Sequence, residues 1–229
     1  MTTPAPAPKP TPQTELRNSS LNGTIEIMRN ILKSNSIDIN ANDEFGWNPL
    51  EYACYYGHID IVQLLLSDSR IDSTKALESG ETPLFIAAQQ GQLAVVQTLL
   101  NIRNIDINKG NKNEATPLFI ACQYNRLDVV KLLMGDKRIE INKPRNDGTT
   151  PLYIACHMGH VELVRWMLNN GRNLDIKYKW NKTRDPLSQA KINVKAPRKD
   201  WEKTDEEMTI RQQRSAEIVQ VFKDFKKKK

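Results

Sequence analysis

The amino-acid sequence predicts an all-α solenoid of stacked helix-turn-helix units with projecting hairpin-like loops. The dipeptide Pro-Leu recurs four times at a spacing of 34 residues, and a fifth copy follows after 35; the prolines are Pro49, Pro83, Pro117, Pro151 and Pro186. An aliphatic pattern with helical spacing follows each of the first four copies. A fixed period of this size indicates one supersecondary unit that is stacked on copies of itself.

The first helix of each unit is predicted to begin at its proline. The residue before the proline is a good N-cap in all five copies, namely Asn48, Thr82, Thr116, Thr150 and Asp185. The oxygen of such a side chain accepts a free backbone N–H, and proline is well suited to the first helical position. The helix ends early, because residues that favour the left-handed conformation stand eight positions after the proline: Gly57, Gly91, Asn125 and Gly159.

The second helix of each unit is predicted from apolar residues at spacings of three and four. In the first full unit these are Ile61, Val62 and Leu65, and the next three units repeat the pattern. This spacing is typical of a helix with one broad buried face. A polar stretch then leads to a loop in which Gly46, Gly80 or Gly148 precedes the next N-cap by two residues, as a tight turn requires.

These units resemble the ankyrin repeat. The matching features are the Thr-Pro-Leu starts, the pairs Gly57-His58 and Gly159-His160, and the segments Ile-Asp-Ile-Asn at 37–40 and 105–108. The resemblance covers roughly residues 15 to 192 and implies paired antiparallel helices that bind other proteins. The family usually has histidine after Thr-Pro-Leu, where this chain has Glu51, Phe85, Phe119 and Tyr153. We therefore expect apolar packing in place of the family's Thr–His hydrogen bond.

Four parts of the chain are expected. Residues 1–14 form a proline-rich tail that cannot build a core and is expected to be disordered. Residues 15–42 form a degenerate N-terminal capping repeat, with a polar first helix and a second helix from Ile25 to Leu32. Residues 43–179 form four ankyrin repeats. Residues 180–229 form an interrupted C-terminal repeat with an insertion near 195–214 and a basic helix.

The C-terminal helix is predicted from Asp205 to about Phe225. Thr204 and Glu207 have the spacing of a capping box at its start. We expect its apolar face to pack on the end of the stack as a delayed second helix; the residues are Ala216, Val219, Phe222 and Phe225. The alternative is a separate amphipathic helix that docks elsewhere on the solenoid or on a partner.

Charge is concentrated in the last quarter of the chain. The whole protein carries a net charge of +6, but residues 172–229 hold 17 basic and 9 acidic residues, a net charge of +8. No apolar stretch near the N-terminus is long enough for a signal peptide or a membrane span. We therefore expect an intracellular, cytoplasmic protein, consistent with a place in a cytoskeletal or other large complex.

No catalytic or metal-binding constellation is apparent in the sequence. Cys54, Cys122 and Cys156 share one repeat position, where small buried helix contacts explain them. His157 and His160 lie near Cys156, but ligands from one helix end do not make a zinc site without a second group. With no phosphate-binding loop or activated nucleophile in view, we expect no enzymatic activity, no cofactor, no metal and no small-molecule substrate.

Binding is expected on the concave face that loop tips and first-helix ends create in stacked repeats. The family's variable contact positions carry over to Glu44, Phe45, Trp47, Tyr55, Tyr56, Glu78, Glu81, Gln89, Gln90, Lys112, Asn113, Tyr124, His157 and Met158. Exposed aromatic residues of this kind are enriched where proteins bind proteins. The alternative for Phe45 and Trp47 is that both pack against the capping repeat.

Two functions are expected from these features. The first is a non-catalytic module or adaptor that binds a protein partner through the concave face, as a subunit of a larger assembly. The second is attachment to an anionic surface, such as nucleic acid, an acidic filament or lipid headgroups, through the basic C-terminus. The residues for the second are Lys226, Lys227, Lys228 and Lys229.

Overall fold

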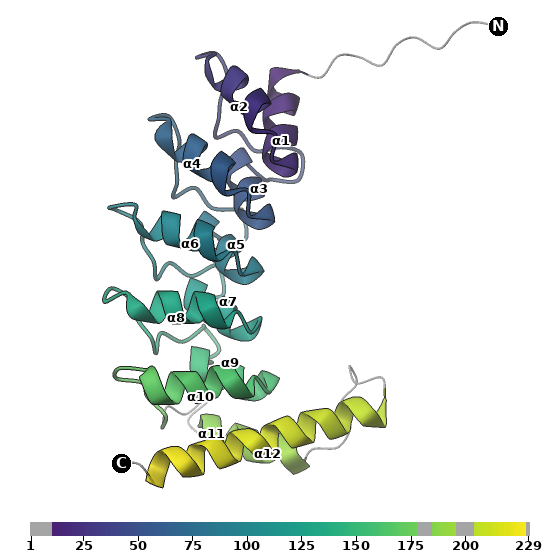
Figure 1. Cartoon of the computed structure of the whole chain (residues 1–229), viewed down its shortest axis with the longest axis vertical. Helices are drawn as coiled ribbons and strands as arrows, with labels where there is room; N and C mark the ends of the chain where they lie inside the picture. The colour runs from purple at the N-terminus through teal and green to yellow at the C-terminus, as the bar shows by residue number, and fades with distance from the viewer. Residues whose placement is uncertain (1–10, 178–184, 196–203, 228–229) are drawn as a thin grey trace, which may run out of the picture.

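The computed structural model describes residues 11–177, 185–195 and 204–227, and within these residues the chain forms twelve α-helices and no β-strand. The helices stack in antiparallel pairs into a long column (Figure 1). The first helices of the four central pairs are α3 (Pro49–Tyr56), α5 (Pro83–Gln90), α7 (Pro117–Gln123) and α9 (Pro151–Met158). The second helices are α4 (Ile59–Ser67), α6 (Leu93–Leu100), α8 (Leu127–Gly135) and α10 (Val161–Asn170). The predicted all-α repeat solenoid and its helix starts are confirmed.

The caps form as the sequence predicts. Thr82 Oγ1 accepts a hydrogen bond from the backbone N–H of Phe85 at 3.2 Å, and the threonines before α7 and α9 make the same contact. The first helices α3, α5 and α9 end at a glycine with positive φ. At the corresponding place after α7, Asn125 has a φ of 55°, so asparagine adopts the left-handed conformation there.

The core lies between the two helix layers and is continuous along the stack. The second residue after each proline is buried, and three of the four are rings: Phe85, Phe119 and Tyr153. The expected apolar packing is therefore confirmed at these three positions. It is wrong at Glu51, which is buried but polar. Its carboxylate accepts the Asn48 N–H at 2.7 Å, and its own N–H donates to Asn48 Oδ1, so the pair forms a capping box.

The three cysteines lie in this core. Cys54, Cys122 and Cys156 are fully buried free thiols, as predicted. Burial raises the pKa of each thiol far above its usual value, because the apolar surroundings disfavour the thiolate. Each is therefore a small packing residue and remains protonated at neutral pH.

The N-terminal end of the column is closed by α1 (Pro12–Asn22) and α2 (Ile25–Leu32). The expected tail over residues 1–14 lies mostly outside the described residues, and its last three residues are helical. Thr11 accepts the N–H of Thr14 at 3.2 Å and Pro12 begins the helix, which is the same Thr-Pro start as in the central repeats. This start was missed because Pro12 precedes Pro49 by 37 residues, one helical turn more than the period.

The C-terminal end is closed by α11 (Pro186–Lys195) and α12 (Asp205–Lys227). The predicted Thr204–Glu207 capping box is present, and α12 packs along α11 and α10. Ile218, Val221 and Phe222 are buried in this contact. The predicted face is wrong at Ala216, which is exposed, because the buried stripe runs instead through Arg211, Ser215, Ile218 and Phe222. The N-terminal half of α12 projects sideways beyond the column (Figure 1).

Within the described segments, no helix has the length and apolar character that a membrane crossing needs.

Candidate protein-binding surface

The C-terminal end of each first helix is fixed by a side chain from the next pair. Gln92 Nε2 donates to the Tyr55 carbonyl at 3.0 Å, and Arg126 Nε donates to the Gln89 carbonyl at 2.9 Å. The same contact recurs three more times, from His58 to Leu21, from His160 to Gln123 and from Asn193 to His157. Carbonyls at a helix end have no partner within the helix, so these bonds satisfy them.

We call these five hydrogen bonds the ladder; three of the carbonyls in it belong to residues that the sequence analysis assigns to binding. Tyr55, Gln89 and His157 each carry one of the clamped carbonyls. Their backbones are therefore held in register by the fold. A surface held in this way loses little conformational freedom when it binds, which favours affinity.

Rings gather at the end of α3. The Trp47 ring centroid lies 5.3 Å from that of Tyr52 and 5.6 Å from that of Tyr55, and Tyr55 lies 5.0 Å from Tyr56. Tyr56 in turn stacks on His58 at 6.0 Å. Tyr55 is 36% exposed and Tyr56 is 48% exposed, whereas Trp47 is half-buried against the core. The structure thus brings four of the aromatic side chains near α3 into one connected cluster that opens to solvent.

Tyr52 anchors the base of this cluster. Its hydroxyl donates to Asp43 Oδ2 at 2.7 Å. Burial, followed by the bond to the Asp43 carboxylate, raises the pKa of Tyr52 to about 12. Asp43 also accepts the backbone N–H groups of Phe45 and Trp47, so it shapes the loop that carries both rings.

Phe45 lies at the tip of that loop and is 67% exposed. The Arg17 guanidinium of α1 lies 5.6 Å from its ring centroid and pairs with Asp43 at 3.3 Å and with Glu44 at 2.8 Å. The loop is therefore tied to the capping pair, as the alternative for Phe45 expected, but most of the Phe45 ring stays in solvent. The ion pair with Arg17 partly neutralises the charge of Glu44.

The other predicted positions continue along the column. Tyr124 and Met158 are about half exposed, Gln89 and Gln90 are half-buried, and Glu78, Lys112 and Asn113 lie exposed on loop tips. Glu81 accepts from Asn111 Nδ2 at 3.1 Å and from the Ser79 hydroxyl, so it belongs to the loop framework. His157 is half-buried, with its ring parallel to that of Tyr153 at 6.4 Å.

We call Phe45, Trp47, Tyr55, Tyr56, Tyr124 and Met158 together the helix-end surface.

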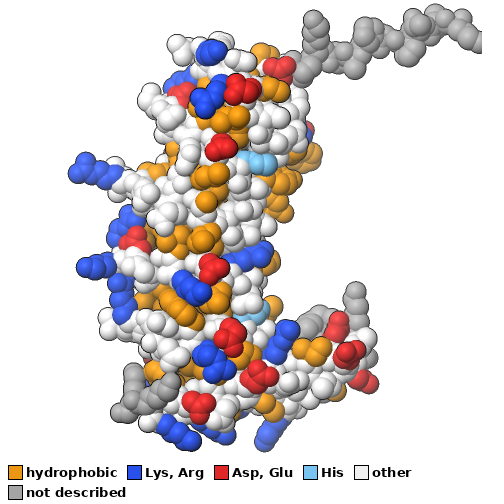
Figure 2. Space-filling model, viewed as in Figure 1, with side chains coloured by type: hydrophobic (Ala, Val, Ile, Leu, Met, Phe, Trp, Pro, Cys, Tyr) orange, Lys and Arg blue, Asp and Glu red, His pale blue; other side chains and the backbone are white. Residues whose placement is uncertain are grey.

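A groove extends this surface at the C-terminal end. It has a volume of about 610 Å³ and lies between the end of α9 and the projecting half of α12; its lining includes Met158, Glu207, Ile210 and Arg214. Figure 2 shows the hollow between the column and this helix. Sequence reasoning missed the contribution of Ile210, because the capping box predicts where α12 begins but not the direction in which it runs.

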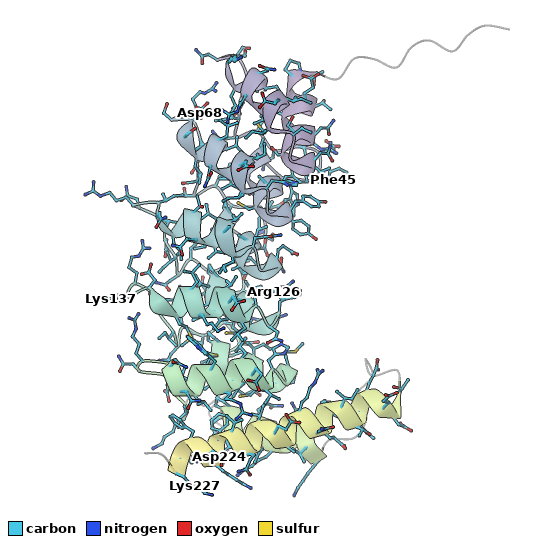
Figure 3. The ribbon with its side chains drawn as sticks, viewed as in Figure 1. Phe45, Asp68, Arg126, Lys137, Asp224 and Lys227 are labelled. Atoms are coloured by element: carbon cyan, nitrogen blue, oxygen red, sulfur yellow. The ribbon has the colours of Figure 1, made fainter. Side chains whose placement is uncertain are left out.

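The basic end of α12 is remote from the helix-end surface. Figure 3 places Phe45 and Arg126 on one side of the column, Lys137 on the opposite side, and Lys227 at the far end of α12. Lys226 and Lys227 are exposed, whereas Lys228 and Lys229 lie outside the described residues. Among the described side chains, no three His, Cys, Asp or Glu residues gather as metal ligands would.

Stacked helix pairs with a clamped, solvent-facing row of helix ends define a repeat scaffold. The family model for ankyrin repeats in three copies matches residues 16–111 and again 84–179. These matches span well over half of the 229 residues, and the chain belongs to the ankyrin-repeat family. Ankyrin repeats are in general modules of protein–protein interaction. No curated protein matches the chain.

Proposed function

We propose that this protein is a non-catalytic adaptor or subunit that binds a protein partner through its helix-end surface. The observation that carries the proposal is the connected cluster of Trp47, Tyr55 and Tyr56, in which Trp47 packs against the core and the rings of Tyr55 and Tyr56 open to solvent. Aromatic anchors surrounded by half-buried polar side chains are typical of binding hot spots. The clamped carbonyls beneath them support a preformed site.

The neighbouring repeat provides a matched replacement for the key residues. Gln89 and Gln90 stand 34 positions after Tyr55 and Tyr56, at the end of an equally regular helix. The double change Tyr55→Gln/Tyr56→Gln therefore places side chains that the fold already accepts there. It removes the rings and leaves the ladder, because the Gln92 bond reaches the backbone carbonyl of residue 55.

The test has two stages. Affinity capture with the full chain identifies a partner, and isothermal titration calorimetry then compares the purified partner with the unchanged chain and with Tyr55→Gln/Tyr56→Gln. We expect binding to weaken by about 2–4 kcal/mol, as for hot-spot residues. A steep loss of binding with added salt, together with no effect of the tyrosine changes, would instead point to the basic C-terminus and overturn the proposal.

Leu93 provides the control. It is exposed and apolar, it begins the second helix α6, and it is not one of the residues of the helix-end surface. The change Leu93→Gln removes a comparable apolar contact from the surface but is expected to leave the affinity unchanged. Equal losses from both variants would show that binding does not depend on the helix-end surface.

A further inference from the structure

A side-chain carboxamide joins neighbouring pairs at the base of the loops. Asn40 Nδ2 donates to the Arg70 carbonyl at 2.7 Å, and Asn40 Oδ1 accepts the Asp72 N–H at 2.8 Å. The amide thus spans a carbonyl and an N–H that are two residues apart on the next pair. Asn108 makes the same two bonds, to residues 138 and 140, and Asn142 makes them to residues 173 and 175.

The junction between the α3–α4 and α5–α6 pairs lacks this asparagine bridge. Thr74 stands in the register of the asparagines, and its hydroxyl donates to Asp72 Oδ1 at 2.7 Å. The complementary groups on the next pair are the Asn104 carbonyl and the Asp106 N–H. Across the described residues, neither has a hydrogen-bond partner. One carbonyl and one N–H, arranged for a carboxamide, therefore remain unused.

A second clamp is missing at the same junction. Arg70 donates to the carbonyls of Leu32 and Ser34, and the arginines at the corresponding positions, Arg138 and Arg172, reach the carbonyls of Leu100 and Asp136. Asn104 occupies this register and is too short to make the contact. The helices still pack across the junction, and Gln92 still joins Tyr55, so the difference is confined to the loop side.

The missing clamps leave an open groove. Its volume is about 490 Å³, and Thr74, Asn104, Asp106 and Lys109 are among the residues that line it. Lys75 and Lys143, which share the register of Lys109, each donate to the main-chain carbonyl of a bridging asparagine. In the part of the chain that the structure describes, the Lys109 ammonium group makes no such bond and is exposed.

We propose that this groove is a binding subsite for a primary carboxamide, presented by an asparagine or glutamine side chain of a partner protein. A carboxamide offers both an acceptor and donors, which the Asp106 N–H and the Asn104 carbonyl complement as they do at the other junctions. The Lys109 ammonium group would donate to the partner's backbone carbonyl beside that side chain, as Lys75 and Lys143 donate to main-chain carbonyls within the chain. Asp106 and Glu114 line the groove together with Lys109 and Lys143, and this balance of charge disfavours a simple anion. None of these residues belongs to the helix-end surface, so the subsite and the proposed function can fail separately.

Amide chemical shifts measured by NMR on the full chain test the subsite. The probes are two blocked amino acids, N-acetyl-asparagine methylamide and N-acetyl-alanine methylamide, and the readout is the Asp106 N–H resonance. We expect a saturable shift with the asparagine probe and binding about tenfold weaker with the alanine probe, since two net hydrogen bonds are lost. Equal responses to the two probes, or no response to either, would overturn the proposal, and this test needs no variant.

Substitutions at Thr74 provide an independent test. Thr74→Asn supplies the missing carboxamide from within the chain, so it should raise the melting temperature by about 2–4 °C and abolish the response to the asparagine probe. Thr74→Ala removes the hydroxyl but leaves the groove open, so the response should persist. A response to the asparagine probe that survives in Thr74→Asn would show that the probe binds elsewhere.

Discussion

The first helices carry aromatic residues at two kinds of position, and only one kind belongs to the core. The second residue after the proline points inward, as at Phe119, which is 1% exposed. The seventh residue after the proline lies at the helix end and points outward, as at Tyr124, which is 48% exposed. Gln90 occupies that outer position in the preceding repeat with the same helix geometry. The inner position is therefore buried in all four central repeats, whereas the outer position accepts aromatic and polar side chains alike.

Truncation after Lys203 should produce the largest effect, because it removes the inner contacts of an entire helix. Without α12, the surface of α10 and α11 that covers Ile218, Val221 and Phe222 becomes exposed. Burial of each such side chain is worth about 1.5–3 kcal/mol, so we expect a much lower melting temperature and aggregation. Thermal melting with light scattering measures both. Unchanged melting would mean that α12 contributes nothing to the core and serves only a partner.

Phe119→Ala and Tyr124→Ala compare the two kinds of position within a single repeat. Removing the buried ring should destabilise the protein by about 3–5 kcal/mol, because it leaves a cavity. Removing the exposed ring should change stability by no more than about 0.5 kcal/mol. Urea unfolding of both variants gives the two values. Similar losses from the two would contradict the division between inner and outer positions.

Glu51 should give an effect that is visible only as a pH dependence of stability. It occupies the inner position, and burial raises its pKa from 4.5 to about 7. The folded state therefore holds a proton that the unfolded state has released, so stability is greatest below pH 4.5 and declines as the pH rises to about 7. The decline in the free energy of unfolding is at most about 1.4 kcal/mol per pH unit.

Glu51→Gln tests this assignment. Glutamine keeps the capping-box geometry without a titratable group. Urea unfolding at several pH values between 4.5 and 7 should show a shallower decline for the variant than for the unchanged protein. Identical pH profiles would show that the carboxyl group of Glu51 titrates normally.

The sequence predicts the repeat unit well because its signals are local. A cap, a proline and a glycine eight residues later define each first helix without reference to the rest of the chain. The same reasoning places the cysteines in the core and predicts the helix from Asp205. It fails at Pro12, where an extra helical turn breaks the period, and at Glu114, which adopts a φ of 57° where other repeats have glycine.

The candidate site was predictable in position but not in structure. The helix-end residues follow from the resemblance to the ankyrin repeat, whose contact positions carry over to this chain. The side chains that hold them do not follow from it, because Gln92, Arg126 and Asn193 share no residue type with His58 and His160. The groove beside α12 depends on the path of a helix of 23 residues, whereas the second helices of the central repeats have 8 to 10. Contacts between units of this kind are set by packing, and one sequence read alone does not reveal them.

The most direct test of the central claim is a paired measurement on Tyr55→Gln/Tyr56→Gln. The affinity for the captured partner and the melting temperature are determined on the same preparation. The outer position of these rings predicts a loss of about 2–4 kcal/mol in binding with nearly unchanged melting. Lowered melting with unchanged affinity would contradict the account, because it would place both tyrosines in the core and leave the helix-end surface without a role in binding.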